Sequence, residues 1–148
     1  MTLREELETT MHEAMRAKDE TTRDTIRMVF SAIKQVEVET RQVVDDAAIL
    51  SILQKEVKIR TETISELSSS DRTDLIDKAK KEISILEKFL PTQLTDEDLA
   101  SIIRKAMTDL SASNPSDMGK VMKEVLPMVK GKAQPDRVSR IVRELLNG

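Results

Sequence analysis

The chain has 148 residues, of which 34% are charged and 1% are aromatic, and its formal net charge is −3. It has no cysteine, which excludes disulfides, zinc–thiolate sites and a cysteine nucleophile. No run approaches about 18 apolar residues, so we expect no membrane-spanning helix, no membrane partner and a cytoplasmic location. Aliphatic residues supply almost all of the apolar content, which is typical of an all-helical protein.

Apolar residues repeat at helical spacing along most of the chain. The pattern predicts an all-α fold with about four helices in an N-terminal domain, residues 1–90, and three in a C-terminal domain, residues 91–148. The predicted helices cover roughly residues 2–18, 21–41, 46–67, 71–90, 95–110, 116–130 and 135–146.

Polar residues at the predicted helix starts indicate how two helices begin. Thr2 with Glu5, and Thr95 with Asp98, have the spacing of a capping box, in which each side chain bonds the other residue's backbone N–H. These pairs predict helix starts just after Thr2 and Thr95.

Prolines and their neighbours predict the remaining breaks. Pro91 is expected to end the fourth helix and to mark the boundary between the two domains. Ser116, which follows a turn at Asn114, is the expected N-cap of the sixth helix. Pro127 is expected to kink or interrupt that helix near residues 123–126, because it lacks a backbone donor.

The charges are distributed unevenly along the sequence. Residues 1–90 hold 15 Lys and Arg against 19 Asp and Glu, a net charge of −4, whereas residues 115–143 hold 7 against 3, a net charge of +4. The second stretch therefore predicts a basic surface on the last two helices. Its candidate residues are Lys120, Lys130, Lys132, Arg137, Arg140 and Arg143. The alternative interpretation is that these cations only keep the surface soluble.

Two glycines accompany these cations. Gly119 falls in the first turn of the sixth helix, where the missing side chain would let an anion such as phosphate approach the backbone N–H groups beside Lys120. Close packing against another helix is the alternative explanation. Gly131 is expected to close the sixth helix in a left-handed conformation, which leaves Lys130 and Lys132 flanking a turn.

Enzyme chemistry has little support in the residues. There is no nucleophile with a base, no set of metal ligands and no complete phosphate loop, so we predict no catalytic residue, metal or cofactor. Without Trp or Tyr the chain has no obvious platform for stacking single-stranded bases. The basic surface thus favours phosphate contacts with a structured RNA. A protein–protein interaction module is the alternative.

Several separated motifs resemble the GatB/YqeY family, which includes stand-alone YqeY-like proteins and the C-terminal tail region of the amidotransferase B subunit. The motifs lie at residues 26–28, 32–34, 72–75, 89–94, 117–122 and 130–133. The sequence departs from the family pattern after Ala133, where Gln134, Pro135 and Asp136 replace the frequent Ala-Asp-Gly continuation.

The resemblance implies an all-helical fold and a tail that helps to hold tRNA. In the alternative, a protein–protein interaction module, the expected partner is an amidotransferase or the translation machinery. The family is described as having carbon–nitrogen ligase activity with glutamine as amido-N-donor. In the amidotransferase that chemistry lies in other domains, so we expect no activity from this chain alone. The leading hypothesis is a tRNA- or RNA-binding accessory protein in which the six cations contact phosphates and Gly119 and Gly131 shape the backbone.

Overall fold

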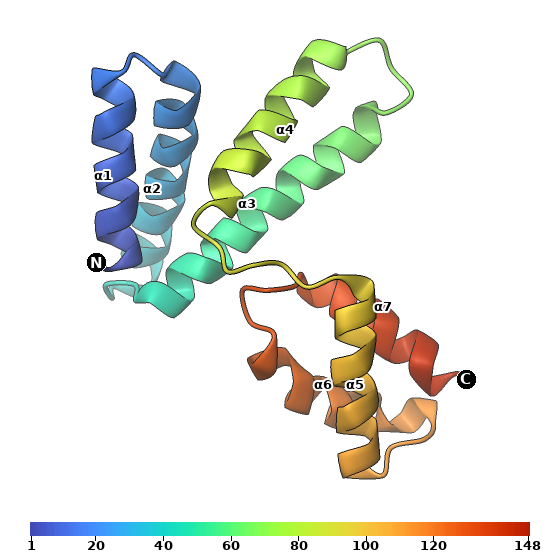
Figure 1. Cartoon of the computed structure of the whole chain (residues 1–148). Coiled ribbons are helices and arrows are strands. Elements are labelled where there is room, and N and C mark those ends of the chain that lie inside the picture. Colours follow the sequence, from blue (N-terminus) through green and yellow to red (C-terminus); the bar gives the residue numbers. More distant parts are fainter. The chain divides into compact units, whose positions relative to one another are not determined.

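The computed structural model describes residues 1–148 and confirms the all-α prediction. It contains seven α-helices, one short 3-10 helix and no strand (Figure 1). The helices are α1 (Leu3–Arg16), α2 (Glu20–Thr40), α3 (Asp46–Leu67), α4 (Thr73–Glu87), α5 (Asp96–Leu110), η1 (Pro115–Asp117), α6 (Met118–Met128) and α7 (Pro135–Leu146). None of them combines the length and the apolar character needed to cross a membrane. The chain forms two compact units, Met1–Pro91 and Thr92–Gly148.

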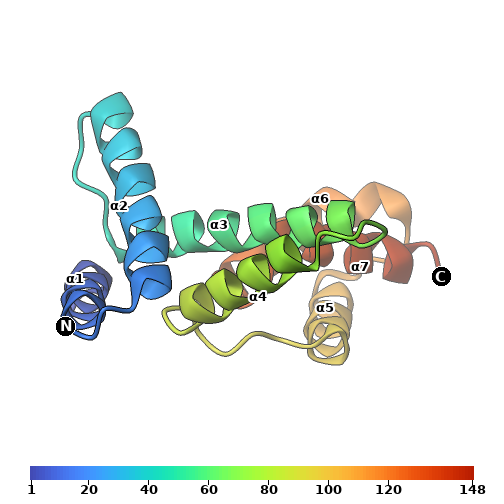
Figure 2. The ribbon, with the colours of Figure 1, turned by 90° about the horizontal axis from the view of Figure 1, so that it is seen from above.

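Unit 1, Met1–Pro91, consists of two helical hairpins. Helix α1 packs against α2, and α3 lies beside α4, as Figures 1 and 2 show. Apolar residues of all four helices share one core, which includes Leu7, Ile26, Ile33, Leu53 and Leu86. Their burial follows directly from the helical repeat of the sequence.

A buried charge cluster joins the two helices of the second hairpin. The Arg60 guanidinium lies 3.1 Å from a Glu56 oxygen and 3.2 Å from a Glu82 oxygen. The Arg60 side chain is only 7% exposed, and the two glutamates are 13% and 14% exposed. Removing any one of these groups would leave a buried charge unpaired, which is costly at this depth. The role of the cluster is therefore structural.

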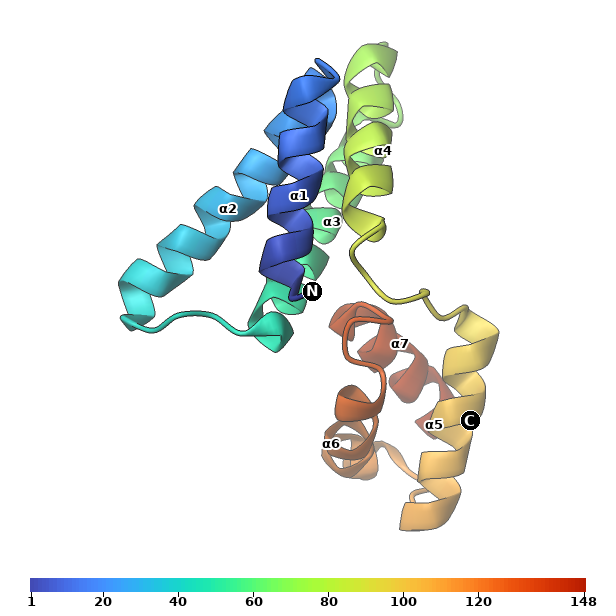
Figure 3. The same ribbon diagram turned by 60° about the vertical axis from the view of Figure 1, so that its left-hand side comes forward.

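Unit 2, Thr92–Gly148, is a three-helix arrangement in which each of α5, α6 and α7 contacts the other two (Figure 3). Its core collects the apolar stripes of these helices with small residues from the connecting loops. The fully or almost fully buried members include Leu99, Ile103, Val121, Val125, Val129, Val138 and Val142. The cations of α6 and α7 are consequently left on the outer sides of this unit.

The helix starts confirm some predictions and correct others. Both predicted capping boxes are present, at Thr2 with Glu5 and at Thr95 with Asp98. The N-cap predicted at Ser116 is wrong. Asn114 instead caps a 3-10 turn that begins at Pro115, because its side-chain oxygen accepts the Ser116 N–H, and α6 follows with Asp117 at its N-cap position and no side-chain cap hydrogen bond.

The effects of the two prolines on their helices are smaller than predicted. Helix α4 ends at Glu87, so Pro91 does not itself terminate it. Helix α6 runs without a break through residues 123–126 and ends at Met128, directly after Pro127. A proline so close to a C-terminus removes only one hydrogen bond of the last turn, which the helix tolerates.

Candidate nucleic-acid interface

The turn that follows α6 is held by backbone hydrogen bonds. Gly131 has a φ of 80°, a left-handed conformation that suits glycine, as predicted. Its carbonyl oxygen accepts a hydrogen bond from Gln93 Nε2 at 2.8 Å, and the carbonyl oxygen of Lys132 accepts one from the Leu94 N–H at 2.9 Å. The Lys132 N–H donates back to Val129 at 2.8 Å. The backbone of the turn is therefore fixed within unit 2.

Two lysines are displayed by this fixed turn. Lys130 and Lys132 are both exposed, whereas Gly131 and Ala133 beside them are buried. Neither lysine forms an ion pair within the chain. Two positive charges thus face solvent from a turn whose backbone is held by these hydrogen bonds.

The outer face of α6 extends this positive surface. Val121 and Val125 are fully buried and set the inner side of the helix. Gly119 and Lys123, four residues apart, lie on the opposite side and are exposed, and Lys130 continues their row just beyond the end of the helix. Lys123 was not among the predicted site residues. Its helical spacing from Gly119 and Lys130 was the signal that could have identified it.

We call Lys120, Lys123, Lys130 and Lys132 the lysine face. Lys120 lies beside the row formed by the other residues of α6, and its Nζ is 3.8 Å from an Asp117 oxygen. Its side chain is 58% exposed, so this ion pair is loose and contributes little to stability. All four lysine charges are therefore accessible to an anionic partner.

Gly119 lies on the lysine face, and the structure decides between the two explanations offered for it. No atom lies within 4 Å of the position that a Cβ would occupy, so close packing against another helix does not explain the glycine. The backbone N–H groups at the start of α6, which were expected to be free for an anion, are also only partly available. The Asp117 N–H donates to Asn114 and the Met118 N–H donates to Pro115. What remains is an open, flat patch of helix surface.

Two of the three arginines of α7 contact other groups of unit 2, and the first of them is Arg137. Its guanidinium donates a hydrogen bond from Nη2 to the backbone carbonyl of Leu94, and its Nε lies 3.4 Å from an Asp96 oxygen. That Nε makes no hydrogen bond, so the contact with Asp96 is an ion pair only. The side chain is 32% exposed. Arg137 therefore joins α7 to the start of α5 and is not freely available to a ligand.

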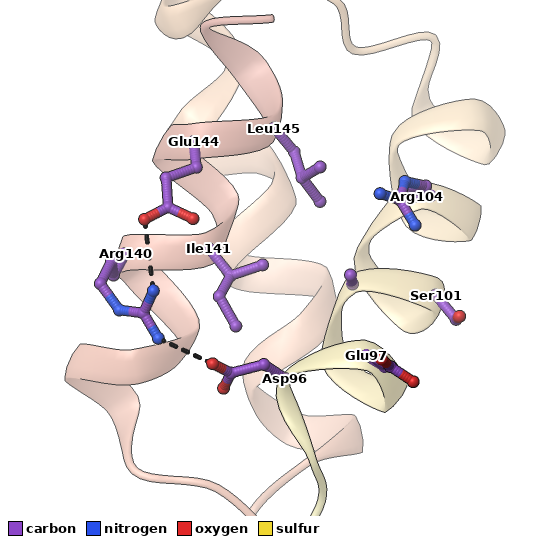
Figure 4. A pocket seen from close by; sticks show the side chains of 9 residues that line it. Asp96, Glu97, Ser101, Arg104, Arg140, Ile141, Glu144 and Leu145 are labelled. Carbon is purple, nitrogen blue, oxygen red and sulfur yellow. Dashed lines mark hydrogen bonds and ion pairs between the residues drawn. The ribbon is translucent and has the colours of Figure 1, made fainter.

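Arg140 is paired twice, as Figure 4 shows. Its Nη2 lies 3.2 Å from Asp96 and its Nη1 lies 3.2 Å from Glu144. The hydrogen bond to Asp96, followed by that to Glu144, raises the pKa of Arg140. Arg143, one turn further along α7, is exposed and forms no ion pair. Of the three predicted arginine contacts, only Arg143 is thus unpaired.

The net charge of the whole of unit 2 explains why most of these lysines are unpaired while two of the three arginines are paired. Residues 92–148 hold nine Lys and Arg against eight Asp and Glu, a net charge of +1, compared with +4 for residues 115–143. The additional acids include those at the start of α5, and the fold brings Asp96 against α7. On α6, α7 and the turn between them, the positive surface that remains is the lysine face together with Arg143.

Known proteins resemble this chain over most of its length. The family model described as YqeY-like protein matches residues 4–146. Similar proteins include one from Pyrenophora tritici-repentis named altered inheritance of mitochondria protein 41, mitochondrial. It is 26% identical over 144 residues, which cover 95% of this chain and 78% of that protein. A protein of the same name from Kluyveromyces lactis is 32% identical over 129 residues, which cover 84% of this chain and 68% of that protein.

The names of these relatives assign them to mitochondria, so a cytoplasmic location for this chain stays a prediction. The match of the family model extends through both structural units and includes the lysine face. The chain therefore belongs to the YqeY-like protein family.

Proposed function

We propose that this chain is an accessory protein that binds structured RNA, with tRNA as the expected class, through the lysine face. One observation carries the proposal: exposed lysines continue along one row from α6 to a turn whose backbone is already fixed. Phosphates of a folded RNA are the ligands that such a row of unpaired cations suits best.

The open surface at Gly119 supports the same function. A polyanion that follows the row from Lys130 past Lys123 reaches Gly119, where no side chain stands between it and the helix backbone. The absence of Trp and Tyr favours contacts with phosphate and sugar over stacking of unpaired bases. Arg143 is a further contact on the neighbouring helix. Arg137 and Arg140 are assigned to holding α7 against α5.

The proposal is tested by titrating the protein with folded tRNA at two salt concentrations. A Lys130→Glu/Lys132→Glu variant is expected to bind at least about tenfold more weakly, with a salt slope lower by about 2, because two phosphate contacts are lost. The matched control is Lys80→Glu/Lys81→Glu, which makes the same change in net charge at two exposed lysines of α4.

A loss of affinity confined to the variant in the turn would support the proposal. Equal losses in the two variants would mean that only the total charge matters, which would count against a defined site. No binding by the native chain at low salt would overturn the RNA proposal. An interaction with an acidic protein surface, such as that of an amidotransferase or a translation factor, would then be the function to test.

A further inference from the structure

A groove between α5 and α7, on unit 2, is not used by the proposed function. Figure 4 shows it with its lining side chains, and its volume is about 380 Å³. Ala100, Ile141 and Leu145 supply its apolar part. Asp96 and Arg140 form their ion pair on one side of it. The groove is thus apolar between charged edges, a composition suited to another helix.

Two charged residues of the groove have no partner in the chain. Glu97 and Arg104 both line it and both are exposed, yet neither forms an ion pair. The charged residues that α7 contributes to the groove are already paired, because Arg140 forms ion pairs with Asp96 and Glu144. A partner that fits this groove should therefore satisfy one free carboxylate and one free guanidinium.

The spacing of these two residues limits what that partner can be. Glu97 and Arg104 are seven residues apart, which is two helical turns or about 10.5 Å, and so lie on the same face of α5. Ala100 lies between them on that face. We call Glu97, Ala100 and Arg104 the α5 seam. Reversing the direction of this seam exchanges its negative and positive ends, so the seam is complementary to an antiparallel copy of itself.

We propose that two copies of this chain associate through antiparallel packing of their α5 seams about a twofold axis. In this arrangement Glu97 of each copy faces Arg104 of the other, which forms the same ion pair twice, as a twofold interface requires. The small side chain of Ala100 sits at the centre, where the two helices approach most closely. Leu145, which is half-buried, flanks the contact and loses solvent exposure, whereas Ile141 beneath it is already buried.

A second copy is the occupant that the charge pattern itself specifies. Any other helix would need an acid and a base at the same spacing and in the opposite order, whereas the chain already carries that pattern. Exposed ion pairs contribute little affinity but set register and orientation, so the predicted dimer is weak and defined in geometry.

The test is sedimentation equilibrium of the native chain and of two charge reversals, Glu97→Arg and Arg104→Glu, over a micromolar to millimolar range. Each reversal alone turns both ion pairs into like-charge contacts and is expected to weaken dimerisation by at least about tenfold. An equimolar mixture of the two variants is expected to recover dimerisation. One chain then presents two cations along its seam and the other presents two carboxylates.

Circular dichroism spectra of both variants provide the control for folding, and unchanged helicity is expected because both side chains are exposed. A native chain that stays monomeric over the whole range would overturn the proposal. So would variants that dimerise as well as the native chain, or a mixture that does not recover association.

Discussion

Helices α6 and α7 both carry cations on the side that faces away from the core of unit 2, but only α7 meets a carboxylate from another α-helix. On α7, Arg137 and Arg140 share Asp96, and Arg140 also reaches Glu144. Among the lysines of α6 and the turn after it, only Lys120 forms an ion pair, with Asp117 at 3.8 Å. The same type of charge therefore holds two helices together at one place and stays open to solvent at the other.

This comparison shows that a count of charges along a sequence window does not locate a binding surface. The window from residue 115 to 143 has a net charge of +4, yet its arginines are partly neutralised by an acid at residue 96. A surface useful for binding a polyanion needs cations whose charges the fold leaves unpaired. Lys123, Lys130 and Lys132 of the lysine face meet this condition, Lys120 has only a loose ion pair, and most of the α7 side does not meet it.

The largest effect expected is on stability, at the α7 side. Arg137→Ala should lower the free energy of unfolding of unit 2 by about 2 kcal/mol, because it removes the hydrogen bond to the Leu94 carbonyl and an ion pair with Asp96. Lys130→Ala should stay within about 0.5 kcal/mol of the native chain, since its side chain has no partner. Urea denaturation followed by circular dichroism measures both. Similar losses of unfolding free energy in the two variants would contradict the distinction between a paired arginine on α7 and an unpaired lysine after α6.

The next effect is on RNA affinity, when two positive charges are removed either from the lysine face or from α7. Lys123→Gln/Lys130→Gln should weaken tRNA binding by about tenfold and reduce the salt slope by about 2. Arg140→Gln/Arg143→Gln should weaken it by less than about threefold, because Arg140 is already occupied by Asp96 and Glu144. Fluorescence anisotropy with labelled tRNA gives both affinities. A larger loss from the arginine pair would transfer the interface to α7.

The smallest effect sharpens the role assigned to Gly119. Gly119→Ala should stabilise the protein by about 0.5 to 1 kcal/mol, because alanine favours the helix and the new methyl group meets no neighbour. The same change should weaken tRNA binding by about threefold if RNA approaches the helix at this point. Thermal unfolding and the anisotropy titration separate the two effects. Higher stability with unchanged affinity would place the RNA contact elsewhere on the lysine face.

Local features of the fold were predictable from the sequence because they depend on residues a few positions apart. The capping boxes at Thr2 and Thr95 and the left-handed Gly131 are examples. The start of α6 was predicted less well, since a 3-10 turn capped by Asn114 precedes the helix and Ser116 lies inside that turn. The tolerance of α6 for Pro127 depended on its distance from the helix end.

The sequence by itself determined that this protein is helical and where most of its helices begin, because helical spacing and capping are local properties. Only the tertiary structure decided which cations are free. Asp96 and Arg140 are 44 residues apart in the chain, and their contact exists because the packing of α5 against α7 brings them within 3.2 Å.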